Sequence, residues 1–282
     1  MGIKTVCMTM HPGKSCGADV AARVIAVLKK AGTALYVDPS INNVLGTNLP
    51  EMDVSKGLPP CDVLLALGGD GTLLRAVQHA VEADVPLLGI NMGRVGFLTE
   101  IEQNRIEEDL HIICSGEYLI EERMLLSVRL NDGPEMLVLN DAVVNRGARL
   151  VAIDAYISDD LIGHYIADGM IVSSPTGSTG YSLSAGGPIV SPDVRCMVVS
   201  PICAHTLQHR PVVVDAKETV RLQLDCDEGQ GIYITLDGQK SMPLDGKDTL
   251  YATGAKKAAK LIRLEKPHFF TLVRKKLTEW SC

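Results

Sequence analysis

The sequence predicts a protein of two domains, in which an α/β domain comes first and a mainly β domain follows. Apolar strand-like runs alternate with helical patterns up to about residue 120, which is typical of a parallel sheet with right-handed crossovers. Short strands separated by turns then continue to about residue 265, and apolar residues at helical spacing end the chain. We therefore expect a Rossmann-like domain over residues 1–120, a β-sandwich-like domain over residues 121–265, and a helix at about 266–282 that returns to the first domain.

Size and charge agree with this organisation and exclude some partners. The chain has 282 residues, of which 46% are hydrophobic, and its net charge is −7. The length leaves room for two domains. The acidic balance argues against a nucleic acid or a membrane surface that would be attracted by bulk charge, although it leaves room for a local basic pocket. No apolar run approaches the roughly 20 residues of a membrane-spanning helix.

The cysteines indicate reduced thiols. None of the eight forms a C-x-x-C pair, and the first residues, M-G-I-K-T-V, are strand-like rather than typical of a signal peptide. We therefore expect a cytoplasmic protein. Cys203, His205 and His209 have a spacing that suggests zinc, but no fourth ligand lies nearby and Pro201 and Pro211 bracket the segment as a loop. No metal site is expected on these residues.

In the first domain, apolar runs predict strands and 3.6-residue periodicity predicts helices. A polar segment with glycine and proline, residues 41–60, is expected to be irregular. The expected strands are Ile3–Met8, Ala34–Val37, Asp62–Leu67 and Val85–Ile90, and the expected helices are Ala18–Lys30, Thr72–Ala83 and Ile106–Ser115.

A glycine turn around Asp70 is the first candidate site. Gly68, Gly69 and Gly71 follow an apolar strand, and Thr72 is expected to cap the helix that comes next. Such a turn brings backbone N–H groups and a helix N-terminus to one point, which suits a phosphate. The carboxylate of Asp70 could accept a proton from a hydroxyl, hold Mg²⁺ or cap the helix in an ordinary tight turn. The pattern matches neither the Walker motif nor the G-x-G-x-x-G fingerprint.

Three further segments carry candidate ligand groups. Asn91–Glu100 leaves the carboxyl end of a strand, where open α/β sheets bind ligands, and its Phe97 could line an apolar pocket or belong to the core. Ala167–Val190 combines hydroxyl residues with glycines, which can bind ribose and phosphate oxygens, although a linker has a similar composition. Asn140-Asp141 could hold a ribose or a carboxamide, but a β-bulge or edge pair explains that dipeptide by itself.

Taken together, seven stretches resemble the NAD kinase family and follow its order. They are Gly68–Thr72, Asn91–Thr99, Asn140-Asp141, Asp168-Gly169, Pro175–Pro188, Pro201–Pro211 and Asp237–Gln239. The glycine–aspartate turn alone also resembles lipid kinases and phosphofructokinases, whereas the serine- and threonine-rich segment is more specific. The chain departs from the family twice: Asp141 stands where the family usually has Glu, and Gly180 where it usually has Ala.

The resemblance implies a reaction and a set of site residues. NAD would bind in the cleft between the domains, and the γ-phosphoryl of ATP, or a phosphoryl of polyphosphate, would move to the 2′-hydroxyl of the adenosine ribose. Asp70 would be the general base, Gly68, Gly69 and Thr72 would bind phosphate, and Mg²⁺ would screen the triphosphate. The family also implies a homodimer or homotetramer. The implied NAD contacts are Gly71, Arg75, Phe97, Asn140, Asp141, Asp168, Thr179, Gly180, Tyr181, Ser182, Ser184 and Gln239.

Two other functions compete with this hypothesis. A kinase acting on a lipid or a sugar would share the Asp70 turn but has no need of the serine- and threonine-rich segment. A non-catalytic NADP-binding sensor would tolerate the loss of Asp70. The sequence leaves open whether NADH also serves as the acceptor.

Overall fold

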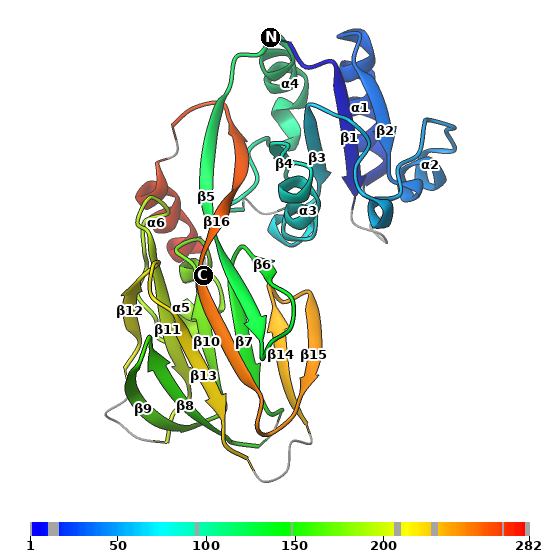
Figure 1. Ribbon diagram of the computed structural model, residues 1–282. Helices are drawn as coiled ribbons and strands as arrows, with labels where there is room; N and C mark the ends of the chain where they lie inside the picture. Colours follow the sequence, from blue (N-terminus) through cyan, green and yellow to red (C-terminus); the bar gives the residue numbers. More distant parts are fainter. Residues whose placement is uncertain are drawn as a thin grey trace. The chain divides into compact units, whose positions relative to one another are not determined.

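The computed structural model describes residues 2–10, 17–93, 96–147, 149–205, 210–226, 231–266 and 268–279. The chain forms two compact units (Figure 1). Unit 1 comprises Met1–Glu122 together with Ala259–Cys282, and unit 2 comprises Arg123–Ala258. Two long strands, β5 (Leu119–Leu130) and β16 (Thr249–Arg263), contribute residues to both units.

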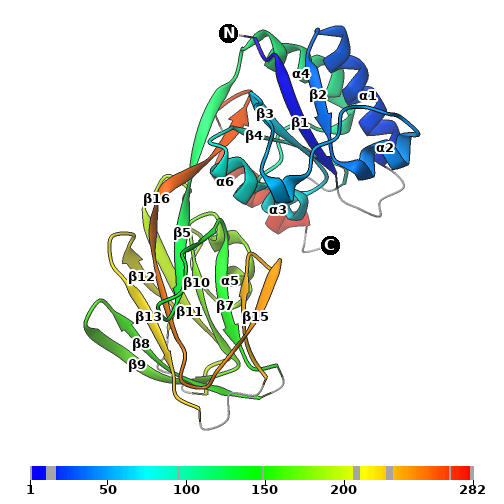
Figure 2. The ribbon, with the colours of Figure 1, turned by 45° about the vertical axis from the view of Figure 1, so that its right-hand side comes forward.

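Unit 1 is built on a parallel sheet with the strand order β2-β1-β3-β4, beside which the end of β16 pairs with β4 through Leu261 and Leu87 (Figure 2). All five residues of β3 are buried, as expected for a parallel strand that is covered on both faces. The elements are β1 (Thr5–Met10), α1 (Gly17–Lys30), β2 (Ala34–Val37), α2 (Pro39–Leu45), β3 (Val63–Leu67), α3 (Asp70–Glu82), β4 (Leu87–Ile90), α4 (Ile106–Ser115) and α6 (Phe269–Glu279), with 3₁₀ turns at Val54–Lys56 and Gln103–Arg105.

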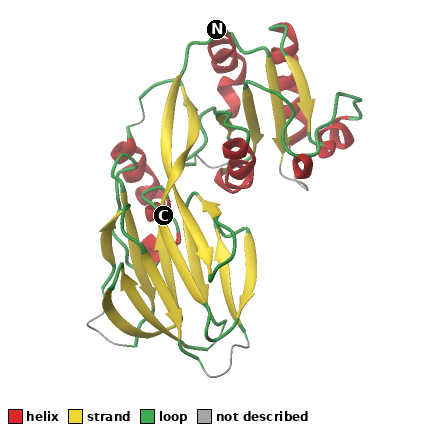
Figure 3. Cartoon of the chain, viewed as in Figure 1, coloured by secondary structure: helices red, strands yellow, loops and turns green. Residues whose placement is uncertain are grey.

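Unit 2 consists mostly of strands (Figure 3). One antiparallel sheet has the order β12-β11-β10-β7-β14-β15, and a second layer contains β16, β13, β8 and β9 with β5 and β6. Side chains from both layers share one core, for example Val144 and Val172 with Leu222. The elements are β6 (Met136–Val138), β7 (Asp141–Asn145), β8 (Val151–Ile157), β9 (Asp160–Ala167), β10 (Gly169–Ser173), 3₁₀ helix η3 (Gly177–Thr179), α5 (Tyr181–Ser184), β11 (Cys196–Ile202), β12 (Val212–Asp215), β13 (Val220–Leu224), β14 (Ile232–Leu236) and β15 (Lys240–Leu244).

The predicted fold class is confirmed: an α/β unit precedes a two-layer β unit, and the C-terminal helix belongs to unit 1. The prediction of an irregular segment from residue 41 was wrong at its start, because α2 forms there. The Asp38 side chain accepts a hydrogen bond from Ser40 N, and Gly46 ends the helix in the left-handed conformation at φ 62°. No helix in the described residues is long and apolar enough to cross a membrane. The six cysteines that the structure describes carry free thiols.

Candidate active site

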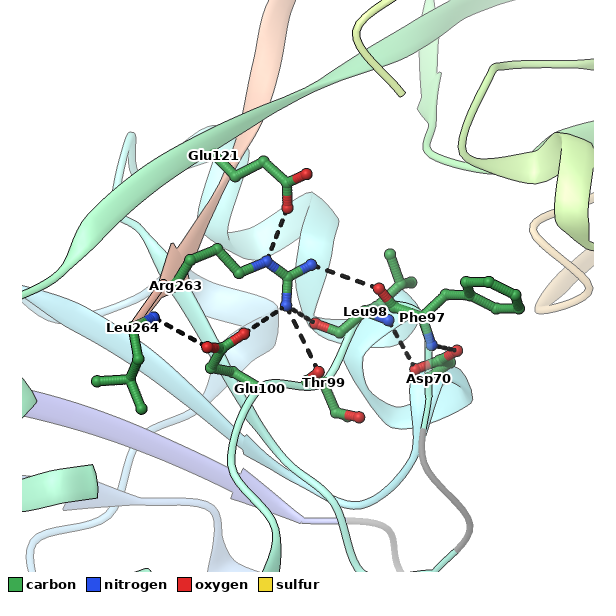
Figure 4. A network of polar contacts seen from close by, with 8 residues as sticks. All are labelled: Asp70, Phe97, Leu98, Thr99, Glu100, Glu121, Arg263 and Leu264. Atoms are coloured by element: carbon green, nitrogen blue, oxygen red, sulfur yellow. Dashed lines mark hydrogen bonds and ion pairs between the residues drawn. The ribbon is translucent and has the colours of Figure 1, made fainter. Parts of the chain in front are cut away.

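Asp70 is the first residue of α3 and lies directly after the turn that follows β3. Its carboxylate accepts two backbone hydrogen bonds from the segment after β4, one at Oδ2 from Phe97 N at 2.8 Å and one at Oδ1 from Leu98 N at 3.1 Å (Figure 4). The glycine turn and the N-M-G-R-V-G-F-L-T segment, separate in the sequence, therefore meet at one carboxylate. With both oxygens bonded to backbone groups, the side chain is held in one orientation.

Two glycines allow close packing in this site, one beside Asp70 and one beside Thr72. A Cβ at Gly96 would lie 1.9 Å from Asp70 Oδ1, so any side chain there would displace the carboxylate. A Cβ at Gly68 would lie 2.1 Å from the hydroxyl oxygen of Thr72. The prediction that Thr72 caps the helix was wrong, because the cap position is Gly69 and the helix already begins at Asp70. Thr72 instead is buried against the glycine turn.

The segment that holds Asp70, residues 96–100, is itself fixed to β4. Its last residue, Glu100, donates its backbone N–H to Gly89 O at 2.9 Å, and Ile101 N donates to the same oxygen at 3.2 Å. Asn91 closes the other end of the loop with two side-chain hydrogen bonds to the backbone of Gly93, each 3.1 Å long. Arg94 and Val95 of the predicted motif lie outside the described residues.

Arg263, at the end of β16, is a residue of this site that sequence reasoning missed. Its side chain is only 4% exposed and forms ion pairs with Glu121 at 2.7 Å and Glu100 at 3.0 Å. It also donates to the carbonyl oxygens of Phe97, Leu98 and Thr99 (Figure 4). The sequence offered one signal for this residue, a single charged side chain within the apolar run Leu261-Ile262-Arg263-Leu264. An arginine in such a run is expected to be buried, and a buried arginine requires charged or polar partners.

The ring of Phe97 lies against the C-terminal helix. Its centroid is 6.5 Å from that of Phe269, and the ammonium of Lys276 lies 4.7 Å from the Phe97 ring. The Phe97 ring thus connects the Asp70 loop to the helix α6. The other predicted contacts of unit 1, Gly71 and Arg75, are exposed on α3, where their spacing of four residues puts them on one face of the helix.

In unit 2, the structure brings Asn140, Asp141 and Gly180 together. A Cβ at Gly180 would lie 3.8 Å from both Asn140 Nδ2 and Asp141 Oδ2. Asn140 Oδ1 is buried and has no hydrogen-bond partner within the described structure. An acceptor left open in a buried position is a candidate group for a ligand donor, because an unmade buried hydrogen bond costs free energy.

Asp237 organises this second site, and sequence reasoning treated it only as part of a turn. Its carboxylate accepts hydrogen bonds from the backbone N–H groups of Leu139, Asn140 and Asp141, at 2.9, 2.6 and 3.2 Å. Burial raises the pKa of Asp237 even though these three bonds lower it. Burial, and then the nearby charge of Asp237, raise the pKa of Asp141 to about 7. The negative charge of Asp237 thus adds to burial in disfavouring the ionised form of Asp141.

The serine- and threonine-rich segment mainly supports this site from within. Ser174 donates its hydroxyl to Leu139 O, and Gly177 sits so close to Asn140 that a Cβ would lie 2.1 Å from Asn140 O. Thr179 donates to Thr176 O at 3.2 Å. Ser182 is fully buried, with its hydroxyl 3.2 Å from that of Ser200, whereas Tyr181 and Ser184 are exposed.

One predicted contact, Asp168, lies apart from this cluster. The antiparallel register of β10 with β7 pairs Ser173 with Asp141 and Gly169 with Asn145, so Asp168 is exposed at the opposite end of these strands. At roughly 3.3 Å per residue, the length of β10 separates it from Asp141. Gln239 is exposed in the β14–β15 turn, two residues after Asp237. In the rejected zinc pattern, His209 lies outside the described residues, and no group of three metal-binding side chains gathers among those that are described.

A carboxylate fixed at the start of a helix, directly after a glycine turn, is suited to an enzyme that transfers phosphoryl groups. The family models of the ATP-NAD kinase N-terminal and C-terminal domains match residues 6–118 and 139–264. The NAD kinase of Caldanaerobacter subterraneus subsp. tengcongensis is 37% identical over 283 residues, which cover 98% of this chain and 100% of the relative. That of Heliobacterium modesticaldum is 38% identical over 98% and 99%. The chain belongs to the NAD kinase family.

Two solved structures share the fold. Yeast NADH kinase complexed with NADH has a TM-score of 0.87 at 23% identity, over 99% of this chain and 88% of the yeast chain. An NAD kinase from Archaeoglobus fulgidus in complex with ATP has a TM-score of 0.73 at 23% identity, over 97% and 98%. At this identity the likeness concerns the fold alone.

Proposed function

We propose that this protein is an NAD kinase that transfers the γ-phosphoryl of ATP to the 2′-hydroxyl of the NAD adenosine ribose, and so makes NADP. The family membership supports the reaction. The observation that carries the proposal is the Asp70 carboxylate, held by Phe97 N and Leu98 N at the N-terminus of α3.

Asp70 would act as the general base. Each carboxylate oxygen has two lone pairs, so each oxygen keeps one after its bond to the backbone and can accept the hydroxyl proton. Phosphoryl transfer passes through a loose transition state in which the proton can leave late, so the reaction does not require a strong base. The two backbone bonds hold the acceptor in place, which lowers the entropic cost of reaching the reactive geometry.

The phosphates would bind at the start of α3. The first turn of a helix leaves backbone N–H groups without partners, and its dipole favours anions. Gly68 and Gly69 have no side chains that would keep a phosphate away from the backbone. Arg75 adds a positive charge on the exposed face that begins at Gly71. Mg²⁺ would arrive with the triphosphate, because this ion usually keeps several waters and binds mainly through substrate phosphates.

Unit 2 would recognise the dinucleotide. The open acceptor Asn140 Oδ1 suits an amino group such as that of adenine, and Asp141, when ionised, can accept hydrogen bonds from ribose hydroxyls. Asp237 would set the position of both residues through its three backbone bonds. Asp168, Tyr181, Ser184 and Gln239 are exposed and therefore accessible to a ligand or a second copy of the chain.

The remaining proposals rest on the family resemblance. The protein would act in NADP biosynthesis in the cytoplasm, as a homodimer or homotetramer. Light scattering of the purified protein measures the mass against the 30.3 kDa of one chain and so decides the oligomeric state.

The test of the reaction is direct. Purified protein is mixed with Mg-ATP and NAD, and NADP is detected with an NADP-specific dehydrogenase, with Asp70→Asn run beside it. We expect NADP from the wild type and a rate about 10²–10⁴-fold lower from the variant, the usual contribution of a general base. If ATP is consumed only with a lipid or a sugar acceptor, the proposal that NAD is the acceptor is wrong. If NADP binds without any turnover, the protein is a sensor.

A further inference from the structure

We propose that Arg263 is a positioning residue for phosphoryl transfer, which acts by holding the loop that aims the Asp70 carboxylate. The inference rests on the proposed function, because Asp70 must be the base for its position to matter. It assigns a role to the end of β16, about 165 positions from the loop in sequence, through contacts that all lie within unit 1.

One peptide group links the two charges. The bond between Phe97 and Leu98 has its carbonyl oxygen 3.4 Å from Arg263 Nη2 and its N–H directed at Asp70 Oδ1, at 3.1 Å (Figure 4). The peptide dipole is thus aligned between a cation and an anion. Each of these bonds strengthens the other, because a polarised carbonyl makes its own N–H a better donor.

The rest of the guanidinium fixes this peptide in space. Nη1 donates to Leu98 O at 3.1 Å and to Glu100 Oε2 at 3.0 Å, and Nε donates to Glu121 Oε2 at 2.7 Å. Glu100 also accepts from Leu264 N at 2.9 Å, so the carboxylate ties the loop to the strand that carries Arg263. The two glutamates compensate the buried positive charge, which is otherwise unfavourable away from water.

The geometry calls for arginine. A planar guanidinium presents five donors in a fixed fork, whereas a lysine ammonium is one point with three donors. Lysine at position 263 could keep one ion pair but could not hold Glu121, Glu100 and the loop carbonyls together. The loop would then no longer be fixed to β16, and the Asp70 carboxylate that it holds could shift. A misplacement of about 1 Å can lower the rate about 100-fold.

The experiment compares Arg263→Lys with Arg23→Lys. Arg23 makes a similar two-pronged pair with Glu107, at 2.7 and 2.6 Å, which joins α1 to α4 in the same unit without contact to the Asp70 loop. We expect Arg263→Lys to lower kcat about 10- to 100-fold with KM for NAD changed less than about twofold. Arg23→Lys should leave both constants at the wild-type level.

A double-mutant comparison separates positioning from general stability. If Arg263 acts through Asp70, then Arg263→Lys should lower the residual rate of Asp70→Asn by less than about twofold. An equal fold-loss in both backgrounds, or a KM that rises as much as kcat falls, would overturn the proposal. Glu100→Gln is the milder variant if Arg263→Lys does not fold, and a wild-type kcat for it would also count against the proposal. A wild type that makes no NADP would instead refute the proposed function itself.

Discussion

The two units hold the carboxylates of their candidate sites in different ways. In unit 1, a single carboxylate, Asp70, is aimed by two backbone N–H groups of a loop that is backed by the Arg263 guanidinium. In unit 2, the carboxylate of Asp237 accepts hydrogen bonds from three backbone N–H groups and lies near the buried carboxylate of Asp141, whose pKa rises to about 7. Unit 1 thus fixes the position of the Asp70 carboxylate, whereas unit 2 shifts the protonation of the Asp141 carboxylate.

This difference has a consequence for function. A general base must be oriented, and we propose that unit 1 orients Asp70 through the loop that the Arg263 guanidinium holds. A group that recognises a ligand can change its charge, and in unit 2 burial makes the charge of Asp141 depend on pH near neutrality. We therefore expect disturbances of unit 1 to lower kcat, and disturbances of unit 2 to change NAD binding and stability.

The largest expected effect comes from a substitution that displaces the Asp70 carboxylate but leaves the carboxylate itself in place. Gly96→Ala adds a Cβ that would lie 1.9 Å from Asp70 Oδ1, so the carboxylate must move and kcat should fall by about 100-fold or more. Gly93→Ala, in the same loop, is the matched control, since a Cβ there meets no described atom within 4 Å. Steady-state kinetics of both variants decide the matter. Equal kcat values would show that the position of Asp70 is not critical.

The titration of Asp141 should appear in stability. Because the folded pKa of about 7 lies above the unfolded value of about 3.9, the protein is most stable at low pH in respect of this group and loses that stability as pH rises to about 7. Asp141→Asn removes the titration. Its free energy of unfolding relative to wild type should therefore rise by about 2–3 kcal/mol between pH 5 and pH 8. Urea unfolding at both pH values measures this, and a difference independent of pH would contradict it.

Close packing under Asn140 predicts a smaller effect. Gly177→Ala places a Cβ 2.1 Å from Asn140 O, so the backbone of the site must shift, at a cost of about 1–3 kcal/mol in stability and with a raised KM for NAD. At Gly180 the nearest atom to an added Cβ is 3.2 Å away, so Gly180→Ala should leave KM close to wild type. Kinetics and thermal unfolding of the pair test whether unit 2 depends on the Asn140 backbone.

The smallest expected effect tests whether the serine- and threonine-rich segment supports the fold or contacts the ligand. Ser182→Ala removes a buried hydrogen bond to Ser200 and should cost about 1 kcal/mol of stability with no change in KM for NAD. Ser184→Ala, at an exposed position, should leave stability unchanged. A raised KM in the first variant, at unchanged stability, would make Ser182 a ligand contact instead of a scaffold residue.

Local patterns in the sequence were sufficient to predict several features of the structure. The alternation of apolar runs with helical periodicity predicted the α/β unit, and the glycines around Asp70 predicted a strand, a turn and a helix. These features depend on neighbours a few residues apart, whose spacing sets which face is apolar. The order of the motifs also led to the correct family, which the two domain matches confirm.

The tertiary structure decided which groups meet. Leu139 N bonds to Asp237 98 positions away, and Arg263 bonds to Leu98 at a separation of 165. The register of β10 with β7 set Asp168 apart from Asp141, and burial turned Ser182 inward. Local propensity contains no information on strand register or on the partners of buried polar groups. These follow only when the whole sheet packs and the buried donors and acceptors of the backbone are paired.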